Sequence, residues 1–345
     1  MFAGTLFALA AGLMWGLVFV APLLLPDYPA ALLTVGRYLA FGLIALPLAL
    51  MDRRDLAQLT RADWLEALKL SAIGNFLYYL CLSAAIQRAG GPLPTVIIGT
   101  LPVVIAICSN LRDHERDGHL PWARLAPSLA LIAAGIACVN QIELAALAGR
   151  EAADLRRYAE GALLAVAAVA CWTWYPIRNA DWLRAHGASA PGRPKPDATP
   201  SGGERQGRSG GGRRGSPRAW ATAQGLVTLP MALVGLALLP ALQGFGLLDA
   251  GFALPLGPRP WAYVGLMLVV GLCASWLGTL CWNEASQRLP TALVGQLIVF
   301  ETLAALAYAF LLRGRPPAAL TLLGIALLVG GVVWALRVKP VTKSG

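Results

Sequence analysis

The chain has 345 residues, of which 57% are hydrophobic and only 13% charged, and its mean hydropathy is +0.62. Soluble domains carry about 25% charged residues, so this composition excludes a cytosolic enzyme. The formal net charge of +10 resides in basic residues between apolar runs, where membrane topology places them. The positive charge therefore reports on membrane orientation. It does not predict a nucleic-acid partner.

Apolar runs long enough to cross a bilayer fill most of the chain. A transmembrane helix needs about 20 mostly apolar residues, and the first run is too long and lacks the basic flank of a cleaved signal peptide. Two runs, 28–51 and 289–312, are each interrupted by one charge, Arg37 and Glu301. The sequence predicts an all-α integral membrane protein with ten transmembrane helices. The other eight runs, free of Asp, Glu, Lys and Arg, cover 2–26, 70–87, 89–111, 125–142, 161–177, 219–248, 260–283 and 318–336.

One long segment differs in composition from everything around it. Residues 187–217 are rich in Gly, Pro, Ser and Arg, and they contain no apolar residue larger than alanine or proline. Such a segment cannot bury enough apolar surface to offset its chain entropy. We expect a disordered cytoplasmic linker here; a basic patch for anionic lipid is the alternative.

The loops also give an orientation. With the N-terminus inside, the inner loops and the C-terminal tail hold more Lys and Arg than the outer loops, largely because of the linker. Positive charge near span ends resists translocation. The sequence therefore predicts that both termini face the cytoplasm of a bacterial cell, with the chain in the inner membrane.

The two halves of the chain resemble each other. Trp15 recurs as Trp172 within a matched set of small and apolar positions, and Gln87-Arg88 recurs as Gln287-Arg288. This predicts two five-helix repeats, residues 1–143 and 158–337, with the linker inside the second. Because five is odd, the second repeat enters the membrane from the opposite side, an inverted repeat typical of secondary transporters.

Together these features resemble the drug/metabolite transporter superfamily, and within it the ten-helix EamA-like family. The resemblance rests on Trp15-Gly16, Gly36-Arg37, the pattern TLPVVIA…ER…G in residues 100–118, and FETLAALAYAFLL followed by TLLGIALLVGGVV. The chain departs from the family pattern where Thr302, in place of proline, follows Glu301, and where Arg313-Gly314-Arg315 replaces an acidic residue. The resemblance implies a proton-coupled or exchange-type carrier of small metabolites, often an exporter, with its cavity between the halves.

Glu301 and Arg37 are the first candidates for a substrate or coupling site. An acid at mid-bilayer costs several kcal/mol unless it is paired, protonated or hydrated. Glu301 is therefore interpreted as a proton carrier or as a structural carboxyl bonded to a neighbouring helix. Arg37 keeps its charge, so it either clamps a substrate carboxylate with its planar fork or neutralises Glu301.

The remaining candidates are polar or aromatic residues inside spans. Uncharged polar groups in membranes usually hydrogen-bond between helices, and deep aromatic side chains either line a cavity or pack. We expect a share of these to contact substrate: Asn75, Asn283, Gln296, Trp15, Trp172, Tyr79 and Trp276.

Two other classes of function were weighed against a transporter. An integral membrane enzyme acting on lipid-linked substrates would use clustered acids and histidines, which occur here only at Asp113, His114, Glu115, Asp117 and His119; a channel would place Glu301 and Arg37 in a continuous pore. The sequence predicts no catalytic residue, cofactor or metal: the three histidines lie in predicted loops, no phosphate-binding loop occurs, and the six cysteines lie in apolar runs. The expected partners are a small-molecule substrate, membrane lipid and coupling protons, while the oligomeric state stays open.

Overall fold

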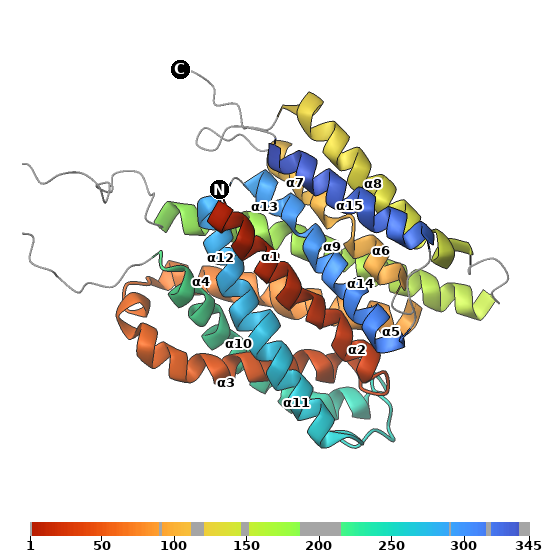
Figure 1. Ribbon diagram of the computed structural model, residues 1–345. Coiled ribbons are helices and arrows are strands. Elements are labelled where there is room, and N and C mark those ends of the chain that lie inside the picture. Colours follow the sequence, from red (N-terminus) through yellow and green to blue (C-terminus); the bar gives the residue numbers. More distant parts are fainter. Residues whose placement is uncertain are drawn as a thin grey trace, which may run out of the picture.

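The computed structural model describes residues 2–89, 92–111, 121–145, 152–186, 215–289, 291–314 and 319–337, and these residues form helices and connections without a strand. Most of the predicted linker, residues 187–214, and the acidic and histidine-containing stretch 113–119 lie outside the described residues. Figure 1 shows the helices packed side by side in one bundle. The predicted all-α fold class is confirmed.

The first half of the chain contains these helices in order. They are α1 (Phe2–Gly16), the 3₁₀ turn η1 (Leu17–Phe19), α2 (Val20–Leu24), α3 (Ala30–Leu56), α4 (Arg61–Leu70), the π-helix η2 (Ser71–Leu77), α5 (Tyr78–Ala89), α6 (Pro92–Ile98), α7 (Leu101–Leu111) and α8 (Trp122–Ala145).

The second half follows a similar order. Its helices are α9 (Ala152–His186), α10 (Pro217–Gly244), α11 (Pro260–Val270), the π-helix η3 (Gly271–Leu277), α12 (Gly278–Arg288), α13 (Thr291–Leu297), α14 (Val299–Arg313) and α15 (Ala319–Arg337).

Within the described residues, seven helical stretches are long and apolar enough to cross a membrane. Two shorter apolar helices, Trp122–Cys138 and Ala319–Gly331, fall on the predicted fifth and tenth spans. The predicted fourth span, 89–111, is divided between α6 and α7, with Gly99-Thr100 between them. The count of ten spans and the inverted repeat stay predictions.

The third span begins earlier than its uncharged run. Thr60 caps α4: its hydroxyl accepts a hydrogen bond from the Asp63 amide, and the Asp63 carboxylate accepts one from the Thr60 amide at 2.7 Å. This reciprocal pair satisfies two of the free amides at the helix start. The helix therefore starts at Arg61, whereas the uncharged run of the third span begins only at residue 70.

The outside of the bundle is apolar, as a lipid-facing surface requires. Leu50, Leu163 and Leu311 are each more than 70% exposed, and many other leucines and valines on the long helices are exposed as well. Exposed apolar area of this extent marks an interaction surface on a soluble protein. On a bundle of apolar helices it indicates contact with the bilayer.

Small residues allow the helices to approach closely inside the bundle. A Cβ on Gly74, in the π-helix η2, would lie 2.3 Å from the ring of Tyr175 on α9. Neighbouring helices in membranes commonly meet through such residues. The six cysteines, which lie in apolar runs of the sequence, are all free thiols.

Candidate functional site: a buried cavity between the two halves

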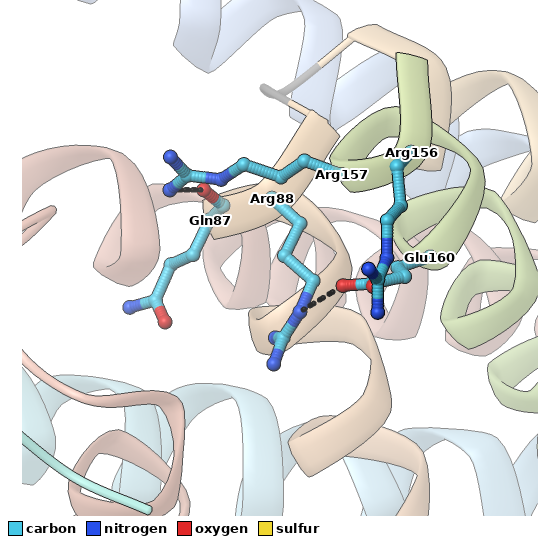
Figure 2. Close-up of a pocket in the computed structure, with 5 residues that line it drawn as sticks. All are labelled: Gln87, Arg88, Arg156, Arg157 and Glu160. Carbon is cyan, nitrogen blue, oxygen red and sulfur yellow. Dashed lines mark hydrogen bonds and ion pairs between the residues drawn. The ribbon is translucent and has the colours of Figure 1, made fainter. Parts of the chain in front are cut away.

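The hollows in the described part of the protein include two of contrasting character. One is open and lies between the ends of α5 and α9, lined by Gln87 and charged side chains (Figure 2). The other is enclosed, deep in the bundle, and its walls come from both halves of the chain. Its lining residues are Trp15, Val18, Arg37, Asn75, Tyr78, Trp172, Ala274, Thr279 and Glu301.

Arg37 enters this cavity from the first third of α3, and it is 96% buried. Its Nε donates a hydrogen bond to Ser275 Oγ on η3 at 3.0 Å. The guanidinium lies 4.5 Å from the centre of the Tyr79 ring and 5.0 Å from that of Tyr38. Because aromatic faces attract cations, these two rings and Ser275 hold the buried charge in one position.

Glu301 lies in the first turn of α14, directly after the break that separates α13 from α14. It is almost fully buried, and Tyr78 donates a hydrogen bond to Glu301 Oε1 at 3.3 Å. The first turn of a helix carries partial positive charge, which stabilises a carboxylate there. The break thus supplies a polar environment for an acid that an unbroken apolar helix would lack.

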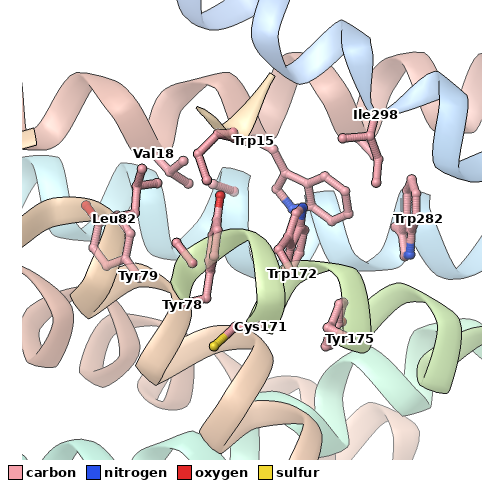
Figure 3. Close-up of a cluster of buried hydrophobic side chains, with 14 of the residues drawn as sticks. Trp15, Val18, Tyr78, Tyr79, Leu82, Cys171, Trp172, Tyr175, Trp282 and Ile298 are labelled. Atoms are coloured by element: carbon pink, nitrogen blue, oxygen red, sulfur yellow. The ribbon is translucent and has the colours of Figure 1, made fainter. Parts of the chain in front are cut away.

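Aromatic rings surround the two charges. Trp172 stacks on Tyr78 with ring centres 4.8 Å apart and on Tyr175 at 4.8 Å, and Trp15 meets its edge at 4.9 Å. Figure 3 shows these rings side by side, with Trp15 contributed by α1 and Trp172 by α9. The paired tryptophans of the two halves therefore meet directly.

Four polar atoms on the cavity wall have no hydrogen-bond partner among the described residues: Arg37 Nη1, Asn75 Nδ2, Trp172 Nε1 and Glu301 Oε2. Leaving such an atom buried and unpaired costs about 1–3 kcal/mol. Three of these atoms are donors and the fourth is a carboxyl oxygen. Their position around one cavity gives it unused capacity to bind a polar group.

Arg37 and Glu301 line the same cavity, but no ion pair joins these two described residues. The two charges therefore share a chamber without neutralising each other by direct contact. The space for a water-sized sphere in the chamber is only about 10 Å³, near the minimum for a single water molecule. The site is closed in this conformation.

The structure brings five of the nine predicted site residues to the cavity: Glu301, Arg37, Trp15, Trp172 and Asn75. Tyr79 does not line the cavity, but its ring packs against the guanidinium of Arg37. The other three lie elsewhere. Gln296 accepts a hydrogen bond from Ser128 on α8, Trp276 donates to Thr222 on α10, and Asn283 belongs to a separate polar network.

That network centres on Asn179, a fully buried residue of α9 that the sequence analysis did not select. Its Nδ2 donates to Asn283 Oδ1 at 2.9 Å, and its Oδ1 accepts from Trp220 Nε1 at 2.8 Å and Gln224 Nε2 at 3.2 Å. The spacing of Trp172, Tyr175 and Asn179 places all three on one helix face. This helical spacing is the sequence pattern from which Asn179 could have been selected.

Ion pairs between the halves close the bundle where α9 ends and α10 begins, which we call the linker side. Arg218 of α10 lies 3.0 Å from Asp52 of α3, and Arg178 of α9 lies 2.6 Å from Glu66 of α4. In addition, Trp182 donates to Asp63 at 2.9 Å. Each acid comes from the first half of the chain and each donor from the second.

The opposite end, which we call the far side, is closed by different chemistry. Tyr28 stacks on Tyr263 with ring centres 5.1 Å apart, and its hydroxyl donates to the Leu256 carbonyl at 2.9 Å. Arg259 pairs with Asp27 at the surface. The far side is therefore closed by aromatic packing and one surface ion pair, whereas the linker side is closed by two ion pairs and the Trp182–Asp63 hydrogen bond.

Nothing in the described part of the chain resembles a metal centre, since no three His, Cys, Asp or Glu side chains gather there. The cavity offers one arginine, one glutamate, an amide and aromatic rings. These groups bind and orient a polar molecule, or hold a proton, and do not form a nucleophile–base pair of the kind that covalent catalysis uses.

Comparison with known proteins agrees with this picture. Residues 2–140 match the EamA-like transporter family. The Inner membrane protein YtfF of Escherichia coli (strain K12) is 51% identical over 340 residues, covering 99% of this chain and 97% of that protein. A solved crystal structure is 17% identical, covers 96% of both chains and superposes with a TM-score of 0.62, which shows the fold alone. The chain is therefore a membrane protein that belongs to the EamA-like transporter family.

Proposed function

We propose that this protein is a secondary transporter that moves a small organic metabolite across the bacterial inner membrane, in the direction of export, by alternating access. The observation that carries the proposal is the closed cavity. Arg37 and Glu301 both line it, and four polar atoms on its wall have no hydrogen-bond partner among the described residues. A related protein with the name of an inner membrane protein supports the location.

The proposed architecture is ten spans in two inverted repeats, and the local structure of the halves supports it. The π-helices η2 and η3 occupy corresponding places, each between two α-helices of one span. The break between α6 and α7 in the first half corresponds to the break between α13 and α14 in the second half. A π-helix is rare and often marks a functional position, so two at matched positions favour a duplicated unit.

The packing of the halves supports the same proposal. The helix α3 packs along α10, and α8 packs along α15, so each helix meets its counterpart from the other half. Likewise, α5 lies against α9 while α12 lies against α1. An exchange of the two halves maps the α3–α10 and α8–α15 contacts onto themselves and the α5–α9 contact onto the α12–α1 contact, as a twofold axis requires.

The proposed substrate carries a carboxylate. Arg37 Nη1, Asn75 Nδ2 and Trp172 Nε1 are donors without partners on one chamber, and a guanidinium fork matches carboxylate geometry. The aromatic rings of Trp15 and Trp172 would then cover the apolar body of the molecule.

Glu301 is the proposed coupling group. Among the described residues it is the single acid on the cavity wall, and one of its oxygens has no hydrogen-bond partner there. A carboxyl that exchanges a proton with each side in turn lets the proton gradient drive the substrate. Protonation would also change the charge that the cavity presents beside Arg37.

Alternating access requires that the two ends open one at a time. The linker side would open by separating the pairs Asp52–Arg218 and Glu66–Arg178, and the far side by parting the Tyr28–Tyr263 stack. Arg218 and Arg178 are partly exposed, whereas Asp52 and Glu66 are mostly buried. Opening the linker side would therefore bring both carboxylates into contact with water.

Transport itself tests the proposal. A thermal-shift screen of the purified protein with small carboxylic acids, amines and sugars identifies ligands, and the hits are then loaded into proteoliposomes. We expect saturable flux and counterflow, in which external unlabelled substrate accelerates exit of labelled substrate. Flux that rises linearly with concentration would indicate a channel, and chemical conversion of the hit would indicate the membrane-enzyme alternative.

The proposed orientation places both termini and the segment 187–217 in the cytoplasm. In a background without its six cysteines, a cysteine introduced at residue 205 should react with an impermeant maleimide only after the cells are opened. Labelling from the periplasm of intact cells would reverse the orientation. A cysteine in place of the exposed Ala250, between α10 and α11, is the matched control and should label in intact cells.

A further inference from the structure

The open hollow between α5 and α9 has the size and charge of a binding site. It holds about 470 Å³ and is lined by Gln87, Arg88, Arg156, Arg157 and Glu160. Ligand pockets commonly hold about 300–1,000 Å³. Three arginines face one glutamate, so the hollow carries excess positive charge and suits an anion.

The polar ends of these side chains line the opening of the hollow. Arg88 lies 3.7 Å from Glu160, which Arg156 also approaches at 3.2 Å, while Arg157 donates to the Gln87 carbonyl at 3.2 Å. In Figure 2 the three guanidinium groups come from two helices and surround one space. Glu160 is thus shared by two arginines, and the third has no carboxylate among the described residues.

The corresponding region of the second half shows that the helix contact does not require these charges. Gly161 of α9 packs on Ala89, and Gly4 of α1 packs on Leu289 in the same way, since a Cβ on either glycine would lie within 2.8 Å of that neighbour. Arg288 pairs with Glu284 of its own helix, whereas the residue four before Arg88 is Ala84. Arg288 also lies over the Phe7 ring of α1, 5.0 Å from its centre. Only Arg88 of these two arginines pairs with a carboxylate of a neighbouring helix, Glu160.

The position of the hollow distinguishes a lipid from a free anion. Glu160 immediately precedes the uncharged stretch 161–177 of α9, so the arginines lie where water meets hydrocarbon. Leu163, one turn further into the bilayer, is 71% exposed, and Leu80, two turns below Gln87 on the same face of α5, is 38% exposed. Basic groups above an exposed apolar surface match the two parts of a phospholipid.

We propose that this basic pocket, formed by Arg88, Arg156 and Arg157, binds the phosphate of an anionic phospholipid whose acyl chains lie along α5 and α9. The site is separate from the central cavity, and it does not depend on which metabolite is transported. It would fix α9, which carries Trp172 and Asn179, against α5 at the edge of the bilayer.

Native mass spectrometry of the full-length protein tests this. The detergent-solubilised protein is mixed with phosphatidylglycerol or with phosphatidylethanolamine of the same acyl chains, and retained lipid is counted. We expect phosphatidylglycerol to be retained preferentially. Each arginine near an anionic headgroup contributes about 1 kcal/mol, so Arg88→Gln with Arg157→Gln should weaken binding about 30-fold.

Two single variants make the test specific. Arg259→Gln removes an interfacial arginine elsewhere on the far side, where it pairs with Asp27, and should leave lipid retention unchanged. Glu160→Gln removes the one carboxylate among the described residues that line the pocket and should strengthen retention of phosphatidylglycerol. A purely structural cluster would instead lose thermal stability in Glu160→Gln without gaining lipid.

Three results would overturn the proposal. They are equal retention of the two lipids by the wild-type protein, unchanged retention in the double arginine variant, and displacement of phosphatidylglycerol by inorganic phosphate at millimolar concentration. The last result would make the pocket a site for free anions. The comparison of two lipids uses the unmodified protein, so it decides the question even if the variants fail to fold.

Discussion

Glu301→Gln is expected to reduce proton-driven net transport to the level of protein-free liposomes while substrate exchange between the two faces continues. Glutamine keeps the size of glutamate and still accepts the hydrogen bond that Tyr78 donates at 3.3 Å. It cannot release a proton, however, so the site stays in one protonation state throughout the cycle. Net movement coupled to protons therefore stops, but exchange needs no proton release.

The measurement separates these two modes in the same vesicles. An inward or outward pH gradient is imposed across proteoliposomes, and net flux of a labelled substrate is followed together with internal pH. Counterflow at equal pH on both sides then reports exchange. Glu284→Gln is the matched control, because Glu284 pairs with Arg288 at the end of α12, outside the cavity. This variant should retain both modes.

A wild-type response of net flux to the pH gradient in Glu301→Gln, with normal abundance, would assign Glu301 a structural role. No other acid lines the cavity among the described residues, so coupling by a proton at this site would then be abandoned. Loss of both net flux and exchange would instead place Glu301 in direct contact with the substrate.

The sequence predicts the central pair of charges because the bilayer penalises them. A charge inside an apolar run is rare without a purpose, and this signal alone identified Arg37 and Glu301, which line one cavity although 264 positions separate them. The recurrence of Trp15 as Trp172 was visible in the same way. These two rings meet at 4.9 Å.

Features that depend on neighbouring helices were harder to predict. Tyr78 and Tyr79 are adjacent in the sequence, and only their helix positions decide that Tyr78 reaches Glu301 while Tyr79 lies under Arg37. The π-helix η2, which directly precedes them, sets those positions. Hydropathy contains no information on such a change of helical pitch.

The break between α13 and α14 was missed for a related reason. An apolar run of 24 residues, 289–312, predicts one continuous helix, and nothing in its hydropathy marks Leu297-Ile298 as a boundary. Packing against α1 and α7 decides it. Residues that tie helices together, such as Gln296 and Asn283, were likewise indistinguishable in sequence from residues that line the cavity.

The geometry around Arg37 makes a second large effect predictable. Arg37 uses Nε for Ser275 at 3.0 Å, rests its plane on Tyr79, and leaves Nη1 without a partner at the cavity. A guanidinium thus has separate groups for its anchor and for a ligand. Lysine keeps the charge but has a single ammonium group, which cannot occupy both places.

Arg37→Lys is therefore expected to raise KM for a carboxylate substrate about 10- to 100-fold, since a hydrogen bond to a charged group contributes about 1.5–3 kcal/mol. The maximal exchange rate should fall less. Initial rates of counterflow over a range of substrate concentrations measure both quantities. Arg288→Lys is the matched control, because Arg288 pairs with Glu284 outside the cavity. If Arg37 only balances the charge of Glu301, lysine suffices and KM stays at its wild-type value, which would contradict direct recognition of the substrate.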